Sequence, residues 1–383
     1  NFKDELLNEF NNILYYDNTI QSKSRSLSNY KNPLYWTELL SKRTKTNFYK
    51  HKTILKNLTS QNSYKIQSQL TEIISKKIDF LNMWGGFFKN DNLITNTLSL
   101  EYNVIVDENN PDIIVCQDSP PDHQASSAAS LTDGMKGKAK IVHWLVESID
   151  RTGDPDYNSC DFSFSSCKFD DSRNVRVPLW SMYVDWFGNQ YVQGRNQSFL
   201  VSPELLLNPP DYTEKKRFCC VLTNNNMALR AEAYPKFIEF GAANGLLVES
   251  RGRAFTNMPP IGGDGGDEKD KLEYIDDFKF HLCFDNGEAD GWITEKLIHP
   301  LSKGVIPIYW GCPDVGEEFN EEAFIHARRF NNIDELNWAV LSIYNKPKLF
   351  AEIQNQSCFP DNKIPDCANP EFLLEKFKKV LGL

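Results

Sequence analysis

The segment at residues 278–315 holds polar and charged side chains whose types and order suit an anionic ligand. An apolar run at 280–284 predicts a buried strand. Four candidate binding residues follow it: Asn286, Trp292, Glu295 and Lys296. In open α/β sheets, ligands bind at the carboxyl ends of strands and close to helix N-termini, which favour anions. The segment therefore predicts a site for a nucleotide diphosphate.

Local signals predict the elements that position these side chains. Residues 285–287 (Asp-Asn-Gly) interrupt the strand, and Thr294 is suited to cap a helix with apolar residues along one face. Gly304 ends that helix, and residues 305–310 form a second apolar strand. The order of strand, loop, helix and strand is the unit from which parallel sheets are built.

The same alternation continues along most of the chain and predicts an α/β fold. Short apolar runs predict strands, at 78–83, 102–106, 112–116, 139–146, 162–165, 217–223, 246–249 and 323–326. Amphipathic runs predict helices, at 91–100, 228–241, 333–344, 349–356 and 370–380. We expect the last of these helices to reach back onto the first half of the chain.

Shifts in composition and the positions of loop-forming segments predict three units. They are a mainly helical N-terminal extension at 1–76, a Rossmann-like domain at 77–205 and a second Rossmann-like domain at 206–383. The irregular segment 188–210 is the expected linker. Residues 118–138 predict a surface loop, and the glycine-rich segment 251–271 predicts either a lid or a plain surface excursion.

Bulk composition argues against several functions. The 383 residues carry a formal net charge of −10, which argues against nucleic acid as a partner but allows a local basic pocket for phosphate. No apolar run of about 18 residues occurs, so we expect no transmembrane segment in this chain. The start at Asn1 has no signal-peptide pattern.

The nine cysteines do not have the spacing of a metal site. No pair has CxxC spacing, so no zinc site is expected. Several cysteines lie in apolar strand-like runs, where this residue is usually a small buried hydrophobe. In an oxidising compartment, Cys160 with Cys167 and Cys358 with Cys367 are candidates for local disulfides.

Several spaced elements of 278–315 closely resemble a known signature. The elements FKF, FDN, WITEK and IPIYWG resemble that of the α-1,3/1,4-fucosyltransferases of glycosyltransferase family 10, and the bacterial branch most of all. The resemblance implies a GT-B fold, in which two Rossmann-like domains face a cleft. It also implies inverting transfer of L-fucose from GDP-fucose to a GlcNAc-type or N-acetyllactosamine-type glycan, with an α-1,3-type linkage and without an essential metal or other cofactor.

The resemblance also assigns roles to residues of the second domain. Lys296 matches a lysine that contacts the donor diphosphate, and Arg230 resembles a second diphosphate ligand, for which a guanidinium is well suited. Glu295 matches a carboxylate that contacts the nucleoside. Asn286 resembles a residue that contacts the donor sugar or orders the loop. Each of the four also has a plain structural alternative as a surface charge, a helix-terminal charge or a turn former.

In the first domain, Glu147 resembles the catalytic base of the family. It ends the apolar strand at 141–146, and a carboxylate there could take the proton of the attacking acceptor hydroxyl. Asp150 and Asp154 are rival candidates. Trp84, at the end of the first strand, is a candidate for the acceptor side or for a packed turn.

Two positions depart from the family pattern. Trp292 stands where the family usually has Tyr, which leaves an indole N–H in place of a phenolic hydroxyl. Pro300 lies inside the predicted helix, where it removes a backbone hydrogen bond and should kink the helix. Two alternatives to GDP-fucose transfer therefore stay open. The chain could use another nucleotide sugar as donor, or it could bind glycans without catalysis. The bacterial-like signature favours a cytoplasmic or peripheral membrane location, with the Golgi lumen as the alternative if a leader or anchor was removed.

Overall fold

The structure is a computed structural model and describes most of the chain after residue 73. The described residues are 74–84, 87–117, 128–187, 200–207, 215–226, 229–259, 261 and 268–383. Several predictions concern segments that lie wholly or largely outside these ranges. They are the helical extension at 1–76, the first half of the loop at 118–138, the linker at 188–210 and the glycines at 262–266.

The first sheet is built from short apolar strands that all run parallel. Its order is β2-β1-β3-β4-β5-β6. The strands are β1 (Ser75–Leu81), β2 (Asn103–Val106), β3 (Ile113–Gln117), β4 (Lys140–Leu145), β5 (Phe162–Ser165) and β6 (Asn174–Arg176). Because the pairs are parallel, the carboxyl ends of these strands share one edge, and Glu147 follows β4 at that edge.

The second sheet is also parallel, with the order β11-β10-β9-β7-β8. Its strands are β7 (Arg217–Val221), β8 (Val248–Ser250), β9 (Phe278–Phe284), β10 (Ile306–Trp310) and β11 (Ile325–His326). In the register, Phe284 pairs with Trp310. The predicted unit at 278–315 therefore forms the centre of this sheet, with its connecting loop at the carboxyl edge.

Helices cover both sheets. The α-helices are α5 (Leu93–Leu98), α6 (Ala128–Leu131), α7 (Ile149–Thr152), α8 (Pro203–Leu207), α9 (Arg230–Ala243), α10 (Glu268–Asp276), α11 (Glu295–Leu301), α12 (Ile333–Tyr344), α13 (Pro347–Gln354) and α14 (Pro370–Leu381). The 3₁₀ turns are η2 (Leu179–Tyr183), η5 (Val315–Glu317), η6 (Ala327–Arg329), η7 (Pro360–Asn362) and η8 (Asp366–Ala368).

The second sheet is apolar on both faces, as expected for a parallel sheet covered on both sides. Alternate residues of β9, namely Phe280, Leu282 and Phe284, join a core that includes residues of α9 and α12. On the opposite face, Cys283 belongs to a core that includes residues of α11. This two-sided burial explains why β9 appears in the sequence as a continuous apolar run.

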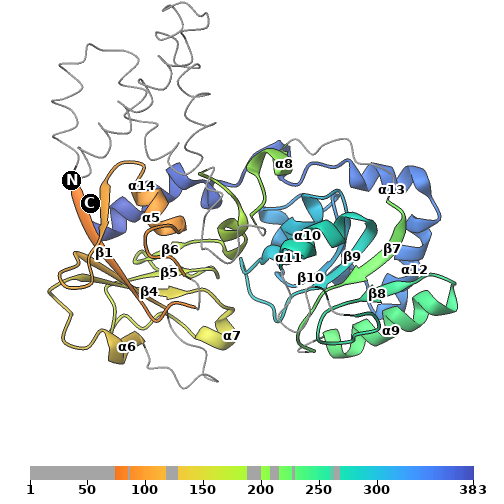
Figure 1. The fold of residues 1–383 in the computed structure, drawn as a ribbon, viewed down its shortest axis with the longest axis horizontal. Coiled ribbons are helices and arrows are strands. Elements are labelled where there is room, and N and C mark those ends of the chain that lie inside the picture. Colours follow the sequence, from red (N-terminus) through yellow and green to blue (C-terminus); the bar gives the residue numbers. More distant parts are fainter. Residues whose placement is uncertain are drawn as a thin grey trace, which may run out of the picture.

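The last helix returns to the first domain, as predicted. Figure 1 shows α14 beside α5 and near β1, away from α12 and α13. The ring of Phe377 stacks on Phe164 of β5 with centroids 4.6 Å apart, and Lys378 Nζ lies 3.0 Å from Glu101. The C-terminal segment therefore belongs to the core of the first domain.

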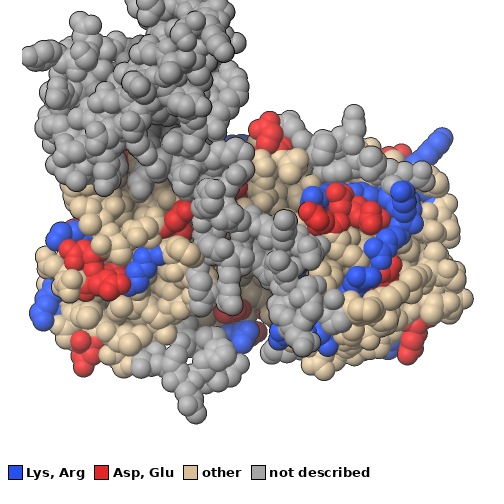
Figure 2. All heavy atoms as spheres, viewed as in Figure 1, with Lys and Arg blue, Asp and Glu red and all other residues tan. Residues whose placement is uncertain are grey.

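The two domains are also joined by a hydrophobic core to which both contribute residues. Residues of the first sheet, of η2 and of α11 belong to one continuous hydrophobic core. The backbone N–H of Trp180, in η2, donates to the carbonyl of Ile293 at 3.0 Å. On the face drawn in Figure 2, Lys and Arg lie among Asp and Glu over both halves of the described chain, without a broad basic field.

The structure differs from three local expectations. Helix α10 occupies part of the segment 251–271 that was expected to be irregular. Helix α11 ends one residue after Pro300, so the proline lies in the last turn instead of kinking a longer helix. The cysteines proposed to pair, Cys160 with Cys167 and Cys358 with Cys367, are not joined by disulfides in the structure. Eight of the nine cysteines are buried, and Cys367 is half-buried.

Candidate active site

Asp285 is the centre of the polar network at the carboxyl end of β9. It is fully buried, and its backbone N–H donates to the Trp310 carbonyl at 2.7 Å. One carboxylate oxygen accepts the Thr294 hydroxyl at 2.5 Å, and the other accepts the Tyr309 hydroxyl at 2.8 Å. Sequence reasoning did not select Asp285, although its place directly after a buried strand was a usable signal.

Burial raises the pKa of Asp285 to about 6. The ammonium of Lys296, 3.8 Å from Asp285 Oδ1, and the two hydroxyl donors act in the opposite direction but do not outweigh the loss of solvent. This carboxylate therefore titrates closer to neutral pH than an exposed aspartate.

Gly311 is required by the same network. A Cβ atom at this position would lie 2.6 Å from Asp285 Oδ2 and 2.6 Å from the Tyr309 hydroxyl. A side chain cannot fit there without displacing one of these groups. The Trp-Gly turn after β10, which was noted in the sequence only as part of a signature, thus has a steric cause.

Lys296 and Glu295 begin α11 beside this network. Thr294 caps the helix by accepting the Lys296 N–H at 3.3 Å. The Lys296 ammonium lies 3.2 Å from Glu295 Oε1, and 18% of its side chain is exposed. Burial opposes the charge of Lys296, but Glu295 and Asp285 outweigh it and raise its pKa. Burial likewise opposes ionisation of Glu295, whose pKa is nevertheless lowered by Lys296 and Lys271.

Lys271 is a second cation at this site that the sequence did not reveal. It belongs to α10, and its ammonium lies 3.8 Å from Glu295 Oε1. The segment around it was expected to be a loop, and nothing in the local sequence indicates a contact with α11. Glu295 therefore lies between two ammonium groups from different helices.

Arg230 is placed beneath the site and not on its surface. It is 1% exposed, and its guanidinium donates to the Phe284 carbonyl, to Thr223 Oγ1 at 2.9 Å and to Asn225 Oδ1 at 2.5 Å. These acceptors are neutral, and within the described part of the chain no carboxylate pairs with Arg230. A buried cation without a counter-ion is unfavourable, and a bound anion would relieve it.

Residues 286–293, hereafter the donor loop, bring Asn286 towards the first domain. Asn286 is half-buried, and no hydrogen bond joins its side chain to another described residue. A Cβ atom added to the next residue, Gly287, would lie 3.7 Å from Ser148 Oγ and 3.9 Å from Asp150 Oδ2. The donor loop therefore meets the loop that follows β4.

Glu147 stands at the start of that facing loop. Its side chain is 33% exposed, and its carboxylate lies 3.9 Å from the Arg151 guanidinium. Asp150 is exposed and close to Gly287, so it stays a rival for the role of base. Asp154 is exposed as well, after the end of α7. Of these three carboxylates, that of Asp150 lies close to the donor loop, and the choice of base among them stays a prediction.

Trp292 is placed differently from expectation. It is 1% exposed and packs in the core shared by the two domains, where its indole N–H has no hydrogen-bond partner among the described residues. A side chain this deeply buried cannot reach a bound ligand unless the donor loop opens. We therefore leave Trp292 out of the ligand-contacting residues proposed below.

Aromatic residues gather at the carboxyl edge of the first sheet. The Trp84 ring centroid lies 4.9 Å from that of Phe87 and 5.7 Å from that of Trp144 on β4. Asn82 has a positive φ of 56° and donates from Nδ2 to the Gln117 carbonyl at 2.8 Å, which fixes the turn after β1. Trp84 is half-buried and lies on the sheet edge that also carries Glu147.

Arg328 is a further residue near the donor loop that sequence reasoning missed. Its guanidinium pairs with Glu288, and its Nε donates to the Gly311 carbonyl at 3.1 Å. The guanidinium also lies 5.4 Å from the ring centroid of Trp310. Arg328 thus joins the first half of the donor loop to the end of β10.

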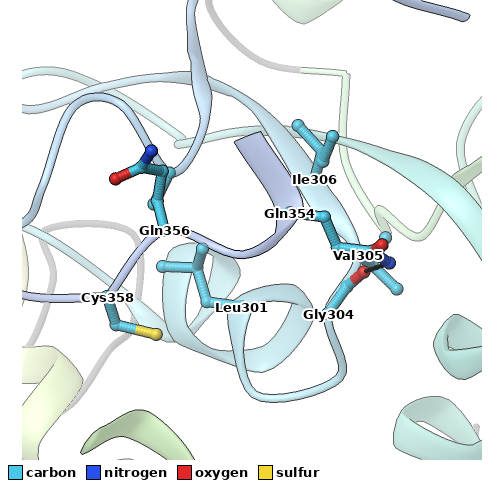
Figure 3. A pocket seen from close by; sticks show the side chains of 8 residues that line it. Leu301, Gly304, Val305, Ile306, Gln354, Gln356 and Cys358 are labelled. Carbon is cyan, nitrogen blue, oxygen red and sulfur yellow. Dashed lines mark hydrogen bonds between the residues drawn. The ribbon is translucent and has the colours of Figure 1, made fainter. Parts of the chain in front are cut away.

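A small pocket elsewhere in the second domain is not part of this site. Figure 3 shows it between the end of α11 and the segment after α13. It is lined by Leu301, Gly304, Val305, Ile306, Ala323, Gln354, Gln356 and Cys358. These residues include the start of β10, whereas the polar network lies at its end. The pocket is therefore at the opposite edge of the sheet.

The described ranges contain neither a cluster of metal ligands nor a membrane-spanning helix. No group of three or more His, Cys, Asp or Glu side chains there is arranged to hold a metal ion. None of the helices there is both long enough and apolar enough to cross a bilayer. The need for a metal and the location of the protein stay predictions.

The second domain matches a family model. Residues 213–354 match the model described as "Glycosyltransferase family 10 (fucosyltransferase) C-term". The matched range contains Arg230, Asn286, Glu295 and Lys296, and it runs from just before β7 to the end of α13. The resemblance found in the sequence is confirmed over this range.

Curated relatives carry the similarity beyond that range. The "Alpha-(1,3)-fucosyltransferase FucT" of Helicobacter pylori is 27% identical over 278 residues, which are 68% of this chain and 55% of that protein. The "GDP-fucose protein O-fucosyltransferase 3" of Danio rerio is 39% identical over 74 residues, which are 18% of this chain and 16% of that protein. The chain spans about half the length of the Helicobacter relative.

Solved structures confirm the fold class. One described as "Crystal Structure of alpha1,3-Fucosyltransferase" aligns with a TM-score of 0.60 at 21% identity, covering 82% of this chain and 92% of that chain. A second, described as containing GDP-fucose, aligns over the same fractions with a TM-score of 0.55 at 22% identity. The two parallel α/β domains thus have the predicted GT-B arrangement.

Proposed function

We propose that this chain transfers L-fucose from GDP-fucose to a hydroxyl of a GlcNAc-containing glycan, with inversion at the anomeric carbon and an α-1,3-type linkage. The match of residues 213–354 to a fucosyltransferase family model supports the choice of donor. The similarity to an α-1,3-fucosyltransferase over 68% of the chain supports the linkage.

The observation that carries the proposal is the pair of cations at the carboxyl edge of the second sheet. Lys296 is partly exposed there. The charge of the buried Arg230 acts to lower the pKa of Lys296, so the two cations lie close to each other. Glu295 and Asp285 offset the charge of Lys296, but no carboxylate among the described residues pairs with Arg230, so a bound anion would offset the remaining positive charge. The diphosphate of GDP-fucose supplies that anion.

In this proposal Lys296 contacts the diphosphate directly, while Arg230 acts from beneath the donor loop. As the bond between the sugar and GDP breaks, negative charge grows on the departing diphosphate. A fixed ammonium in a partly buried site stabilises that charge. We therefore expect transfer without an essential metal ion, and activity that persists in a chelator would support this.

Glu295 and Asn286 complete the donor side of the proposal. Glu295 is held ionised between Lys296 and Lys271, and an ionised carboxylate can accept hydrogen bonds from the ribose hydroxyls. The side-chain amide of Asn286 makes no hydrogen bond to another described residue and lies on the donor loop, beside the junction with the first domain, which suits a contact with the sugar.

Glu147 is the proposed base. The acceptor O–H gives its proton to the carboxylate while the oxygen attacks the anomeric carbon from the face opposite GDP. The new C–O bond forms as the bond to the diphosphate breaks, and GDP leaves with the electron pair. A β-linked donor thereby yields α-linked fucose. The approach of the donor loop to the loop after β4 supports this assignment.

The acceptor is proposed to bind along the first domain. Trp84 offers a half-buried aromatic surface at the edge that carries Glu147, and aromatic surfaces with a few polar groups are typical of ligand sites. GlcNAc or N-acetyllactosamine-type glycans are the proposed class. We also propose a cytoplasmic or peripheral membrane location, from the bacterial-like signature.

The decisive experiment offers the purified protein a panel of nucleotide sugars together with an array of glycans. We expect fucose to be incorporated from GDP-fucose onto GlcNAc-containing members, with α-anomeric product by NMR. Faster turnover of another nucleotide sugar would replace the proposed donor. Glycan binding without turnover of any donor would indicate a non-catalytic member.

A further inference from the structure

Three residues of the first domain donate hydrogen bonds to backbone carbonyls of the donor loop, which belongs to the second domain. The N–H of Lys168 donates to the Asp290 carbonyl at 2.9 Å, the Arg176 guanidinium donates to the Gly291 carbonyl, and the N–H of Trp180 donates to the Ile293 carbonyl at 3.0 Å. These contacts cover the stretch that immediately precedes Thr294, the cap of α11.

Arg176 is the most heavily bonded of the three. It ends β6, only 13% of its side chain is exposed, and it forms an ion pair with Glu318 at 2.5 Å. Its Nε also donates to the Ser166 carbonyl at 3.2 Å. Glu318 is itself buried and accepts the Trp180 indole N–H at 2.8 Å. The guanidinium is therefore held in one orientation by partners from both domains.

A second set of contacts holds Gly291 from its other side. Asp314 accepts the Gly291 N–H at 2.8 Å, and the ammonium of Lys168 pairs with Asp314 and lies 2.7 Å from Glu317. The N–H of Gly291 is thus fixed by Asp314, which pairs with Lys168 of the first domain. The carbonyl of Gly291 is fixed by Arg176, also of the first domain.

We propose that Arg176 is a positioning residue for the donor site, which sets the donor loop and the start of α11 relative to the base on the first domain. The inference rests on the proposed function. Thr294, the cap of α11, directly follows the donor loop, and Lys296 lies two residues further on. A shift of the donor loop therefore moves the ammonium of Lys296 relative to the diphosphate. The first domain thereby contributes to donor binding through residues that do not touch the donor.

Gly291 offers a sharp probe of this arrangement. Its φ is +75°, and a Cβ atom there would lie 2.6 Å from Arg176 Nε and 2.8 Å from Lys168 Cγ. Gly134 has the same φ of +75°, but a Cβ atom there would meet nothing within 4 Å. Gly134→Ala therefore reproduces the backbone strain of Gly291→Ala without disturbing the arginine.

The test compares wild type, Gly291→Ala and Gly134→Ala by calorimetric titration with GDP and by steady-state kinetics with GDP-fucose. We expect Gly291→Ala to raise the Kd for GDP and the KM for GDP-fucose by at least about tenfold, with Gly134→Ala unchanged. A purely structural loss lowers the active fraction, and hence the apparent kcat, but leaves KM as it was.

Variants at position 176 supply the second measurement. Arg176→Gln removes the charge opposite Glu318, whereas Arg176→Lys keeps a cation there and loses the planar fork. We expect the donor KM to rise in Arg176→Gln and to recover partly in Arg176→Lys. If Arg176→Gln fails to fold, the comparison of Gly291→Ala with Gly134→Ala still decides.

The outcomes separate the two levels of the argument. Wild type that binds GDP, together with an unchanged Kd and KM in Gly291→Ala, overturns the positioning role and leaves the proposed function standing. Wild type that binds no GDP overturns both. An equal rise of KM in both glycine variants assigns the effect to backbone strain and also overturns the positioning role.

Discussion

The carboxylate of Asp285 lies 3.8 Å from the ammonium of Lys296, but only the lysine reaches solvent. Two hydroxyl groups donate hydrogen bonds to Asp285 and fix its position. The buried carboxylate in turn attracts the ammonium of Lys296. The charge available to a ligand at the surface therefore depends on a carboxylate that the ligand cannot contact. This arrangement has consequences for stability as well as for binding.

Asp285→Asn should change how stability depends on pH. The pKa of Asp285 is about 6 in the folded protein against an ordinary value of 3.8, so between these values the folded state holds a proton that the unfolded state has lost. Its contribution is fully present below about pH 4 and is lost as pH rises to about 6, by roughly 3 kcal/mol. The asparagine variant lacks this term.

The measurement is denaturant unfolding of both proteins between pH 4 and pH 7. We expect wild type to lose stability relative to the variant across this range. The comparison with the variant matters because Glu295, whose pKa is lowered, contributes in the opposite direction. A constant difference between the two proteins would show that the pKa of Asp285 does not change on folding.

Lys296→Ala should weaken GDP binding by roughly 2–5 kcal/mol, because it removes the partly buried ammonium proposed to contact the diphosphate. Lys379→Ala is the matched control, since Lys379 is an exposed lysine on α14. Isothermal titration with GDP checks both. An unchanged affinity in Lys296→Ala would remove this lysine from the donor site.

Arg230→Met tests whether a buried cation helps to hold the anion. The change removes the charge and leaves the Phe284 carbonyl without its two N–H donors, which should cost about 1–3 kcal/mol of stability. We also expect weaker GDP binding in the folded fraction. Arg329→Met, at an exposed arginine of the same domain, is the control. Normal GDP affinity would make Arg230 a structural residue only.

Glu147→Gln should lower kcat by about 10²–10⁴-fold, because the amide cannot accept the proton of the acceptor hydroxyl. GDP binding should stay at the wild-type level, since Glu147 lies on the opposite domain. Asp150→Asn and Asp154→Asn are tested in parallel by the same transfer assay. Full activity in Glu147→Gln, with loss in Asp150→Asn, would move the role of base to Asp150.

Thr294→Ala should destabilise the protein by about 1 kcal/mol, because the side chain caps α11 and donates to Asp285. Thr294→Ser keeps the hydroxyl and should stay close to wild type. Chemical unfolding measures both variants. A serine variant as unstable as the alanine variant would show that the methyl group, and not the hydroxyl, matters.

The sequence predicted most of the strands, because buried parallel strands are continuous apolar runs, but it missed β6, which has only three residues. It also predicted α12 at its observed bounds, since that helix is clearly amphipathic. Helix α10 was missed because its nine residues are mostly charged; among its residues from 271 onwards, the buried ones are Leu272 and Ile275. A helix with so few apolar positions gives a weak periodic signal.

The sequence indicates candidate site residues where a local pattern or the family resemblance marks them. Glu295 and Lys296 follow a recognisable loop, and the structure places both in the first turn of α11, as expected. Lys271 comes from another helix, and its approach to Glu295 depends on how α10 packs. Trp292 was assigned to the donor site because it stands where the family usually has a Tyr, whereas in the structure its side chain is buried in the core that residues of both domains share.

The return of α14 to the first domain limits how the two halves of the molecule can move. The chain passes between the domains once before β7 and again before α14, so two separate connections join them. Each of the two connections limits how far the domains can separate, and the core that residues of both domains share limits it further. A substitution that loosens α14 from the first domain would therefore weaken one of the two connections and part of the first domain's core together.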